Sequence, residues 1–219
     1  MIFSIGHSTL DEASFLKALR GRVSTVIDVR SHPTSRWPQF HKESLEKWLP
    51  ESGVSYEWDP RLGGWDKRHL PLADAMVGHG VDVACYARGK FPKQRIAAKI
   101  LLADEHGPAL GAPSDSKPVW TSQGLYDFSW FMSLPEFVSG ALALRTRGET
   151  EDVAIMCCEG PWYKCHRSMI SDFLVYAGSD ALHLPGKKMH SQMIGNRIQR
   201  YDDEIVSIWK DLISPDVES

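Results

Sequence analysis

A strand–loop–helix segment at residues 153–177 constrains the fold of this chain more than any other stretch. Residues 154–158 are five consecutive apolar or sulfur-containing residues, which is typical of a strand buried on both faces of a parallel sheet. A Glu-Gly-Pro turn follows, and from about Cys165 the apolar residues recur at helical spacing until Gly178. Because open α/β sheets bind ligands beyond the carboxyl ends of their strands, this loop is the first candidate site.

The amino-terminal part of the chain shows the same alternation of strands and helices. Strands are predicted at residues 2–5, 23–29 and 54–58, and helices after Glu12 and near residues 43–49. A capping box formed by Thr9 and Glu12 is predicted to start the first helix. This β-α-β-α-β order favours parallel pairing through right-handed crossovers. We therefore predict a single α/β domain over residues 1–219, with a mostly parallel sheet flanked by helices.

Residues of about 66–118 interrupt this pattern and are predicted to form an irregular insertion or mobile loop. The segment 86–99 mixes two aromatic side chains with five basic ones and has no acidic residue. Such a mixture can follow a nucleic-acid backbone, although a basic run is more often a solvated surface. The predicted phosphate contacts are Arg88, Lys90, Lys93 and Arg95.

The bulk composition limits the classes of protein that this chain can belong to. With 25 basic and 28 acidic residues the net charge is −3, so the whole chain does not have the strong basicity typical of nucleic-acid binders. Four cysteines without a regular framework argue against a disulfide-stapled secreted protein. No apolar run approaches the roughly 20 residues of a membrane span. A cytoplasmic protein without membrane contact is therefore predicted.

The loop at residues 159–167 carries the side chains best suited to catalysis or ligand binding. A helix N-terminus and neighbouring cations lower the pKa of a thiol, which predicts a reactive Cys165 thiolate beside His166 and Arg167. The same two cations would hold phosphate or another oxyanion, with Glu159 as an orienting group or base. In the alternative interpretation the cysteines are buried core residues and Arg167 pairs with Glu159.

Polar residues also follow the first two predicted strands. His7 and Ser8 come after the first strand, and Asp28 and Arg30 end the second. Since the carboxyl ends of neighbouring parallel strands meet at one edge of the sheet, we predict that these side chains share one cleft with the 159–167 loop. A buried ion pair of Asp28 with an arginine is the alternative. The other predicted ligand contacts are Arg36, Gly63, Gly64 and Tyr126.

The cysteine and histidine spacing does not predict a metal site. Cys157, Cys165 and His166 include ligand types for zinc or iron, but a closed zinc site has four ligands, usually in short-spaced pairs. The adjacent side chains of Cys165 and His166 are expected to point in different directions. The phosphatase or rhodanese loop, a cysteine with an arginine six positions later, also loses most of its support, because Tyr163 and Lys164 stand six positions after the two adjacent cysteines.

Together these motifs resemble the bacterial domain of unknown function 488 (DUF488). The shared elements are Ile5-Gly6-His7-Ser8, Ile27-Asp28-Val29-Arg30 with Pro33, Ser35 and Arg36, Leu62-Gly63-Gly64, Tyr126 and Met132 with Glu136-Phe137, Met156-Cys157-Cys158-Glu159 and Cys165-His166-Arg167-Ser168. The chain departs from the family pattern in its long 66–118 region and at Cys158, where a small residue is commoner. The resemblance implies an α/β fold and a shared cleft, and it names no activity or cofactor.

The predicted function is the binding of a phosphorylated or nucleotide-like ligand, with an enzyme slightly favoured. Arg30, Arg36 and Arg167 would hold anionic groups, and His7 or His166 would transfer protons. The alternative is a binding or sensing module in which the thiols and His166 carry redox, metal or haem chemistry, or in which the basic segment binds nucleic acid.

Overall fold

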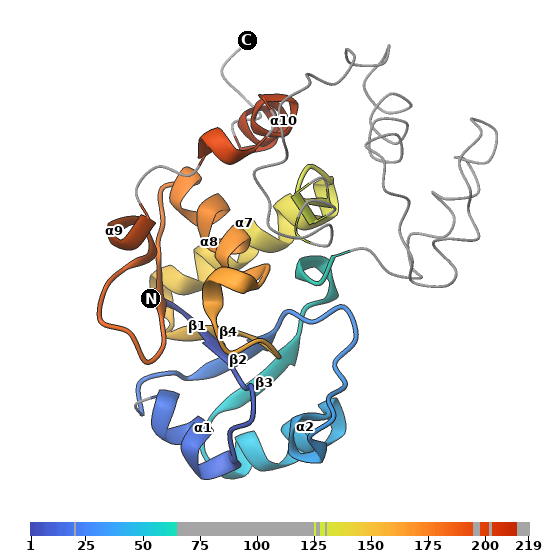
Figure 1. The fold of residues 1–219 in the computed structure, drawn as a ribbon, viewed down its shortest axis with the longest axis vertical. Coiled ribbons are helices and arrows are strands. Elements are labelled where there is room, and N and C mark those ends of the chain that lie inside the picture. Colours follow the sequence, from blue (N-terminus) through green and yellow to red (C-terminus); the bar gives the residue numbers. More distant parts are fainter. Residues whose placement is uncertain are drawn as a thin grey trace, which may run out of the picture.

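The computed structural model describes residues 1–19, 21–64, 125, 128–129, 131–194, 198–201 and 203–213 (Figure 1). The insertion predicted at residues 66–118, its four basic residues Arg88, Lys90, Lys93 and Arg95, and Tyr126 lie outside these ranges. The fold and the site are therefore built from the two segments on either side of that region.

Within the described residues, five strands form one fully parallel sheet, which confirms the predicted α/β class. The strands are β1 (Ile2–Gly6), β2 (Thr25–Asp28), β3 (Ser55–Trp58), β4 (Val153–Cys157) and β5 (Ala181–His183). Their order in the sheet is β3-β2-β4-β1-β5. The strand of the 153–177 segment thus lies between the first two strands, and Cys157 pairs with Gly6. The carboxyl ends of β1, β2 and β4 meet at one edge, as predicted.

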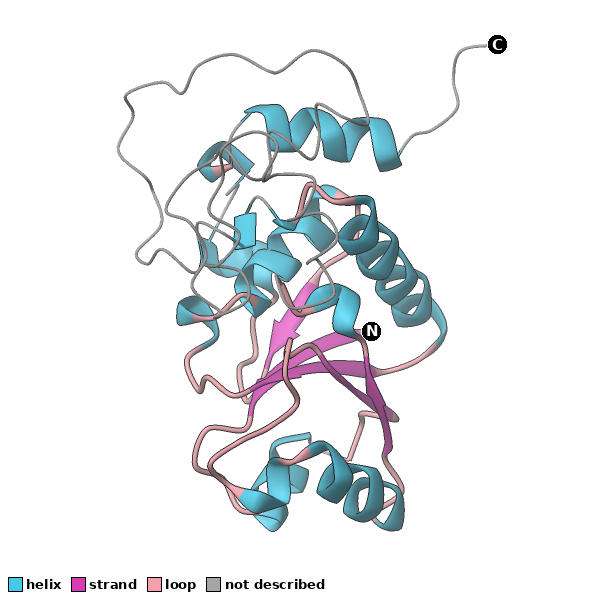
Figure 2. Cartoon of the chain, turned by 90° about the vertical axis from the view of Figure 1, so that its right-hand side faces the viewer, coloured by secondary structure: helices cyan, strands magenta, loops and turns pink. Residues whose placement is uncertain are grey.

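Helices cover both faces of the sheet (Figures 1 and 2). The described helices are α1 (Glu12–Leu19), α2 (Lys42–Glu51), α7 (Pro135–Thr150), α8 (Arg167–Tyr176), α9 (His190–Ile194) and α10 (Asp203–Ile213). The helices α1 and α2 lie on one face, whereas α7, α8 and α10 lie on the other. The start of α1 differs from the prediction, because the Asp11 carboxylate accepts a hydrogen bond from the Ser14 amide at 2.7 Å. Asp11, immediately before the helix, is the cap in place of Thr9.

Side chains along the central strand alternate between two hydrophobic cores. Ile155 and Cys157 of β4 belong to the core under α7 and α8, whereas Ala154 and Met156 belong to the core under α1 and α2. This period of two is the geometry of a strand buried on both faces. It also decides on which face of the sheet each residue of the site will lie.

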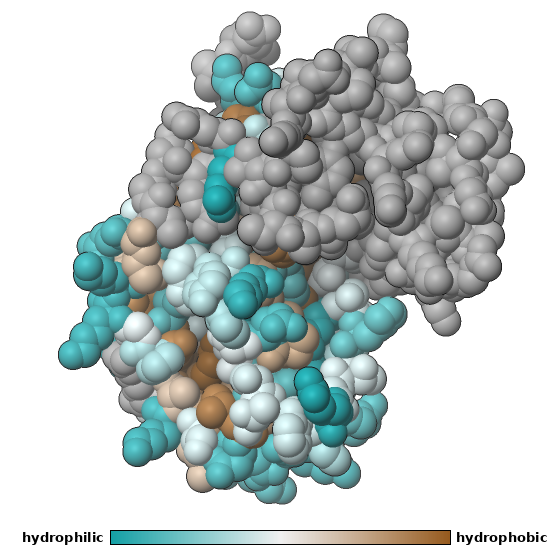
Figure 3. All heavy atoms as spheres, in the orientation of Figure 1, coloured by the Kyte–Doolittle hydropathy of each residue, from teal (hydrophilic) through white to brown (hydrophobic). Residues whose placement is uncertain are grey.

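The described surface is mostly polar. Hydrophilic and intermediate residues dominate it on the face seen in Figure 3. In the described part of the chain, only Met1 and Tyr163 are large hydrophobic side chains with substantial exposure. No helix among these residues has the length and apolar character needed to cross a membrane.

Candidate functional site

Three ligand-type atoms converge where β4 ends and α8 begins. Cys165 Sγ lies 3.7 Å and Cys157 Sγ lies 3.9 Å from the same atom, His166 Nδ1. The two sulfurs and this nitrogen all lie within 4.8 Å of one another. Both cysteines are buried, with exposed fractions of 4% for Cys157 and 3% for Cys165. We call Cys157, Cys165 and His166 the Cys-Cys-His cluster.

The expectation that Cys165 and His166 point in different directions is wrong. Cys165 has an extended backbone (φ −129°, ψ 152°), whereas His166 already has helical angles (φ −58°, ψ −17°). Adjacent side chains point to opposite sides only when the backbone continues as a strand. The change from extended to helical backbone between these two residues brings the thiol and the imidazole to the same side.

Three neighbouring groups fix the orientation of the cluster. His166 Nε2 lies 2.9 Å from the Val29 carbonyl oxygen. Because a carbonyl only accepts, Nε2 carries the proton and Nδ1 faces the sulfurs. Arg167 Nε donates to Cys165 Sγ at 3.4 Å. The Phe128 ring lies 4.9 Å from the imidazole, centroid to centroid, and packs beside it.

The pKa values of the thiols are driven apart by their mutual contacts. Burial alone would raise the pKa of Cys165, but the hydrogen bond from Cys157 and the nearby His166 and Arg167 lower it well below its usual range. Hydrogen bonds to Cys158 and Cys165, together with burial, raise the pKa of Cys157. The hydrogen bond from Cys157 lowers the pKa of the third thiol, Cys158, to about 7 against the effect of burial. Of the two buried thiols, Cys165 is therefore the one whose surroundings favour the thiolate.

The Arg167 guanidinium has partners within the fold on all three nitrogens. Besides Cys165 it donates to Ser4 Oγ at 3.3 Å, to the Gly160 carbonyl at 3.3 Å and to the Glu159 carbonyl. Its side chain is 1% exposed. The Glu159 contact is made by the backbone, so the predicted ion pair with the Glu159 carboxylate is not the contact that the structure has. Arg167 connects the ends of β1 and β4 and is not arranged as an open anion clamp.

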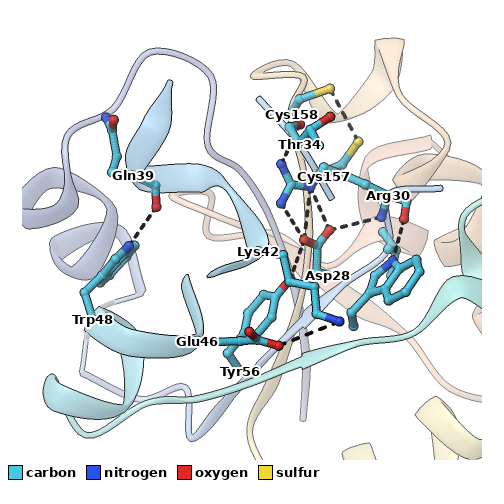
Figure 4. Close-up of polar contacts among 12 residues, drawn as sticks. Asp28, Arg30, Thr34, Gln39, Lys42, Glu46, Trp48, Tyr56, Cys157 and Cys158 are labelled. Carbon is cyan, nitrogen blue, oxygen red and sulfur yellow. Dashed lines mark hydrogen bonds and ion pairs between the residues drawn. The ribbon is translucent and has the colours of Figure 1, made fainter. Parts of the chain in front are cut away.

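Asp28 lies at the end of β2, two positions after Val26, and therefore on the face of α1 and α2. Its polar contacts are drawn in Figure 4. Its fully buried carboxylate accepts hydrogen bonds from Arg30 Nε at 2.8 Å and Nη2 at 2.5 Å and from the Tyr56 hydroxyl at 2.9 Å. Arg30 Nη1 donates to the Thr34 carbonyl at 3.0 Å. The structure therefore has the buried Asp28–Arg30 ion pair that was one of the two predicted alternatives. Tyr56 was missed because its link to Asp28 joins two strands.

His7, at the end of β1, is buried on the same face as Asp28. Its ring stacks on Phe40, with the centroids 4.3 Å apart and the planes inclined by 10°. His7 Nδ1 lies 3.1 Å from the Ser8 carbonyl and must donate to it, while the buried Nε2 has no hydrogen-bond partner among the described residues. Burial first, and then the charge of Arg30, lowers the pKa of His7 to about 4, with Arg167 adding to the shift. The His7 ring is thus neutral near pH 7, and its Nε2 is an acceptor without a donor among the described residues.

This buried neutral state predicts a loss of stability in acid. Between pH 7 and pH 5, the free energy of unfolding of the wild type should fall by about 2 kcal/mol more than that of a His7→Phe variant. In that range the unfolded chain, with an ordinary His pKa of 6.5, binds a proton that the folded state, with a pKa of about 4, does not bind. The contribution of His7 to the free energy of unfolding is full above pH 6.5 and is lost progressively toward pH 4. Urea unfolding at both pH values measures the difference, and equal losses in the two proteins would refute it.

The remaining predicted contacts shape the loops. Ser8, at a positive φ of 46°, donates its amide to the Cys158 carbonyl at 3.0 Å, so the β1 and β4 exits run side by side. A Cβ on Gly63 would lie 2.6 Å from the Ser31 amide nitrogen, which explains a glycine there by close packing. Gly64 has a φ of +90° and lies against Phe128. Arg36 is exposed.

The structure thus brings the predicted residues to one edge of the sheet but divides them between its two faces. The Cys-Cys-His cluster and Arg167 lie on the α8 face, and His7, Asp28 and Arg30 lie on the face of α1 and α2. The common edge was predicted correctly. The single shared cleft stays a prediction.

A buried polar chain beside the site was not predicted at all. His183 Nε2 lies 2.8 Å from His190 Nδ1, and His190 Nε2 lies 2.7 Å from the Asp172 carboxylate. The Trp162 ring stacks on His183 with centroids 4.1 Å apart. This chain holds the 159–167 loop against β5 and α9. No sequence spacing links its members, since they come from four different segments.

Comparison with known proteins gives one match. The sequence model of the domain of unknown function DUF488 matches residues 13–74. No curated protein and no solved structure matches the chain. The matched segment holds the β2 exit with Asp28 and Arg30 and the Leu62-Gly63-Gly64 turn, two of the features on which the resemblance rests. This match supports the resemblance to DUF488 predicted from the motifs, over residues that make up less than half of the chain.

Proposed function

We propose that this protein binds a thiophilic divalent metal ion, of which zinc is the type, through Cys157, Cys165 and His166. One observation carries the proposal: two sulfurs and one imidazole nitrogen, from the end of β4 and the start of α8, lie within 4.8 Å of one another. Thiolate and imidazole are the ligands that zinc prefers in proteins.

The spacing of the three atoms fits a tetrahedral ion. Zn–S bonds of about 2.3 Å and Zn–N bonds of about 2.0–2.1 Å imply tetrahedron edges of about 3.6 Å between sulfur and nitrogen. The two sulfur–nitrogen distances in the cluster are 3.7 and 3.9 Å. The two sulfurs lie within 4.8 Å of each other, whereas two Zn–S bonds of about 2.3 Å imply a sulfur–sulfur edge of about 3.8 Å. An ion can therefore be accommodated if the sulfurs approach each other by up to about 1 Å.

The surroundings of the cluster have the character of an outer ligand shell. A metal-binding histidine usually donates its second ring N–H to a carbonyl or carboxylate, and His166 has such a partner in Val29. The hydrogen bond from Arg167 stabilises negative charge on Cys165. The buried thiols would otherwise be expected to stay protonated.

Three protein ligands leave one position on a tetrahedral ion. Among the described residues, no further His, Cys, Asp or Glu belongs to the group. Catalytic zinc sites keep such a position for water or a substrate atom, whereas structural sites fill all four. When bound, zinc supplies Lewis acidity and lowers the pKa of a bound water. We therefore propose a functional site in preference to a purely structural one.

The phosphorylated or nucleotide-like ligand predicted from the sequence has less support. The guanidinium groups of Arg30 and Arg167 donate to groups of the protein itself. An anion would have to displace these buried contacts before either side chain could bind it. Of these three predicted arginines, the exposed Arg36 is the one that could contact a ligand without such a displacement.

Metal content and affinity test the proposal. Wild-type protein, purified under reducing conditions and loaded with Zn²⁺, is expected to retain one ion per chain after gel filtration. Cys157→Ser, Cys165→Ser and His166→Asn should each weaken binding by at least about 100-fold, because even the loss of an outer-shell partner costs about 10–100-fold. Co²⁺ should give sulfur-to-metal charge-transfer bands that disappear in the same variants.

Cys158→Ser is the matched control, since it removes a neighbouring thiol that lies outside the cluster. This variant should bind Zn²⁺ as the wild type does. Retention of no metal by the wild type, or equal loss of affinity in the control and in the ligand variants, would contradict the proposal.

A further inference from the structure

A third thiol lies beside the Cys-Cys-His cluster without belonging to it. Cys158 Sγ lies 3.9 Å from Cys157 Sγ (Figure 4), and Cys158 is exposed. Of the three cysteines in the described part of the chain, the other two are buried. Oxidation of cysteine depends on access to the thiol, so an oxidant from solution meets Cys158 first.

The geometry also indicates which disulfide the oxidation would finally form. Disulfide-bonded residues have Cα atoms about 4.4–6.8 Å apart, whereas adjacent residues joined by a trans peptide are only about 3.8 Å apart. A bond between Cys157 and Cys158 would therefore be strained and easily exchanged. Cys165 offers the better partner, because it is eight positions away in sequence and its sulfur lies within 4.8 Å of Cys157 Sγ.

We infer that Cys158 is a peroxide-reactive thiol whose oxidation passes through Cys157 to Cys165 and so removes both sulfur ligands from the metal. The release of metal rests on the proposed function, whereas the thiol chemistry depends only on the three sulfurs. The co-reactant is hydrogen peroxide, which is small and approaches the exposed thiol directly. The site would thus lose its metal under oxidising conditions and regain it after reduction.

Each step of this relay balances. The Cys158 thiolate attacks one peroxide oxygen, the O–O bond breaks, and hydroxide leaves to give a sulfenic acid. Cys157 then gives up its proton and attacks the Cys158 sulfur, the S–O bond breaks, and the hydroxide that leaves takes up a proton to become water. The Cys165 thiolate finally attacks the Cys157 sulfur and the Cys158 thiolate leaves. Overall two thiolates lose two electrons, and one peroxide with two protons becomes two waters.

Peptide mapping tests the end point. Trypsin cuts after Arg147, Lys164 and Arg167, so Cys157 and Cys158 share the peptide 148–164 while Cys165 lies in the peptide 165–167. After brief treatment of the zinc-loaded protein with hydrogen peroxide and blocking of free thiols, a disulfide between these two peptides is expected. Fragmentation of the linked peptides should assign the bond to Cys157. A bond from Cys158 to Cys165, a bond confined to peptide 148–164, or a bond to Cys85 would overturn the inference.

The rate of metal release tests whether Cys158 is the first thiol to be oxidised. Peroxide should transfer zinc to a chromophoric chelator, and Cys158→Ser should slow this transfer by at least about tenfold while its zinc affinity stays unchanged. Cys85→Ser serves as the control for the thiol outside the described residues. Equal release rates in the wild type and Cys158→Ser would contradict the relay. If the reduced protein binds no zinc but still forms the inter-peptide disulfide, the proposed function fails and the thiol relay stands.

Discussion

Replacing Arg167 with alanine is expected to lower the free energy of unfolding by about 3–5 kcal/mol, the range found for truncation of large, fully buried side chains. Arg167 is among the largest fully buried side chains of the described core. Its guanidinium binds Ser4 Oγ, two carbonyls of the 159–160 turn and Cys165 Sγ. The variant leaves a cavity and removes hydrogen bonds at once, and typical domains have only about 5–15 kcal/mol of stability.

The control for this prediction is Arg145→Ala. Arg145 is 37% exposed and reaches Glu149 only at 3.9 Å, so its loss should cost less than about 1 kcal/mol. Arg167→Lys should fall between the two, because lysine keeps the charge but cannot donate in several fixed directions. Urea unfolding measures all three variants. A cost for Arg167→Ala as small as that of the control would show that the buried contacts of Arg167 are not structural.

Replacing Gly6 with alanine is expected to cost about 3 kcal/mol or more, or to prevent folding, because overpacking a rigid backbone contact lies at the upper end of such effects. A Cβ at this position would lie 1.9 Å from the Glu159 carbonyl oxygen and 2.7 Å from Arg167 Nη2. Gly6 pairs with Cys157 in the sheet, so the loop after β4 would have to move away from β1. Zinc affinity should fall together with stability.

Gly53→Ala separates this steric effect from conformational strain. Gly53 has a φ of +78° and nothing within 4 Å of an added Cβ, so the expected cost is only the roughly 1–2 kcal/mol of a left-handed alanine. Thermal unfolding ranks the two variants. If Gly53→Ala lowered the unfolding temperature as much as Gly6→Ala, the close approach of the β1 and β4 exits would not explain why position 6 is a glycine.

Local patterns in the sequence were sufficient to predict the parallel α/β class and the four strands β1 to β4. The continuous apolar run at residues 154–158 identified β4 (Val153–Cys157), because a strand buried on both faces needs apolar residues at every position. Alternation of strands and helices then gave parallel pairing. The first helix cap was misplaced because Thr9 and Asp11 both have side chains that can cap, and only the position of the first helical turn distinguishes them.

The candidate site was predictable in composition but not in geometry. Cys165, His166 and Arg167 were identified from their place after a strand, yet their partners come from distant segments. The Val29 carbonyl, Ser4 and Tyr56 became visible only when the sheet brought them together. The convergence of Cys165 and His166 depends on one change of backbone conformation, which residue types alone do not specify.

Zinc K-edge X-ray absorption on the zinc-loaded, reduced protein tests the central claim most directly. The cluster predicts a first shell of two sulfur atoms at about 2.3 Å and one imidazole nitrogen at about 2.0–2.1 Å, with one further light atom at the open position. In Cys158→Ser the spectrum should be unchanged, and in Cys165→Ser one sulfur should be lost. A shell of light atoms without sulfur, or one with a third sulfur that disappears in Cys158→Ser, would contradict a metal centre formed by Cys157, Cys165 and His166.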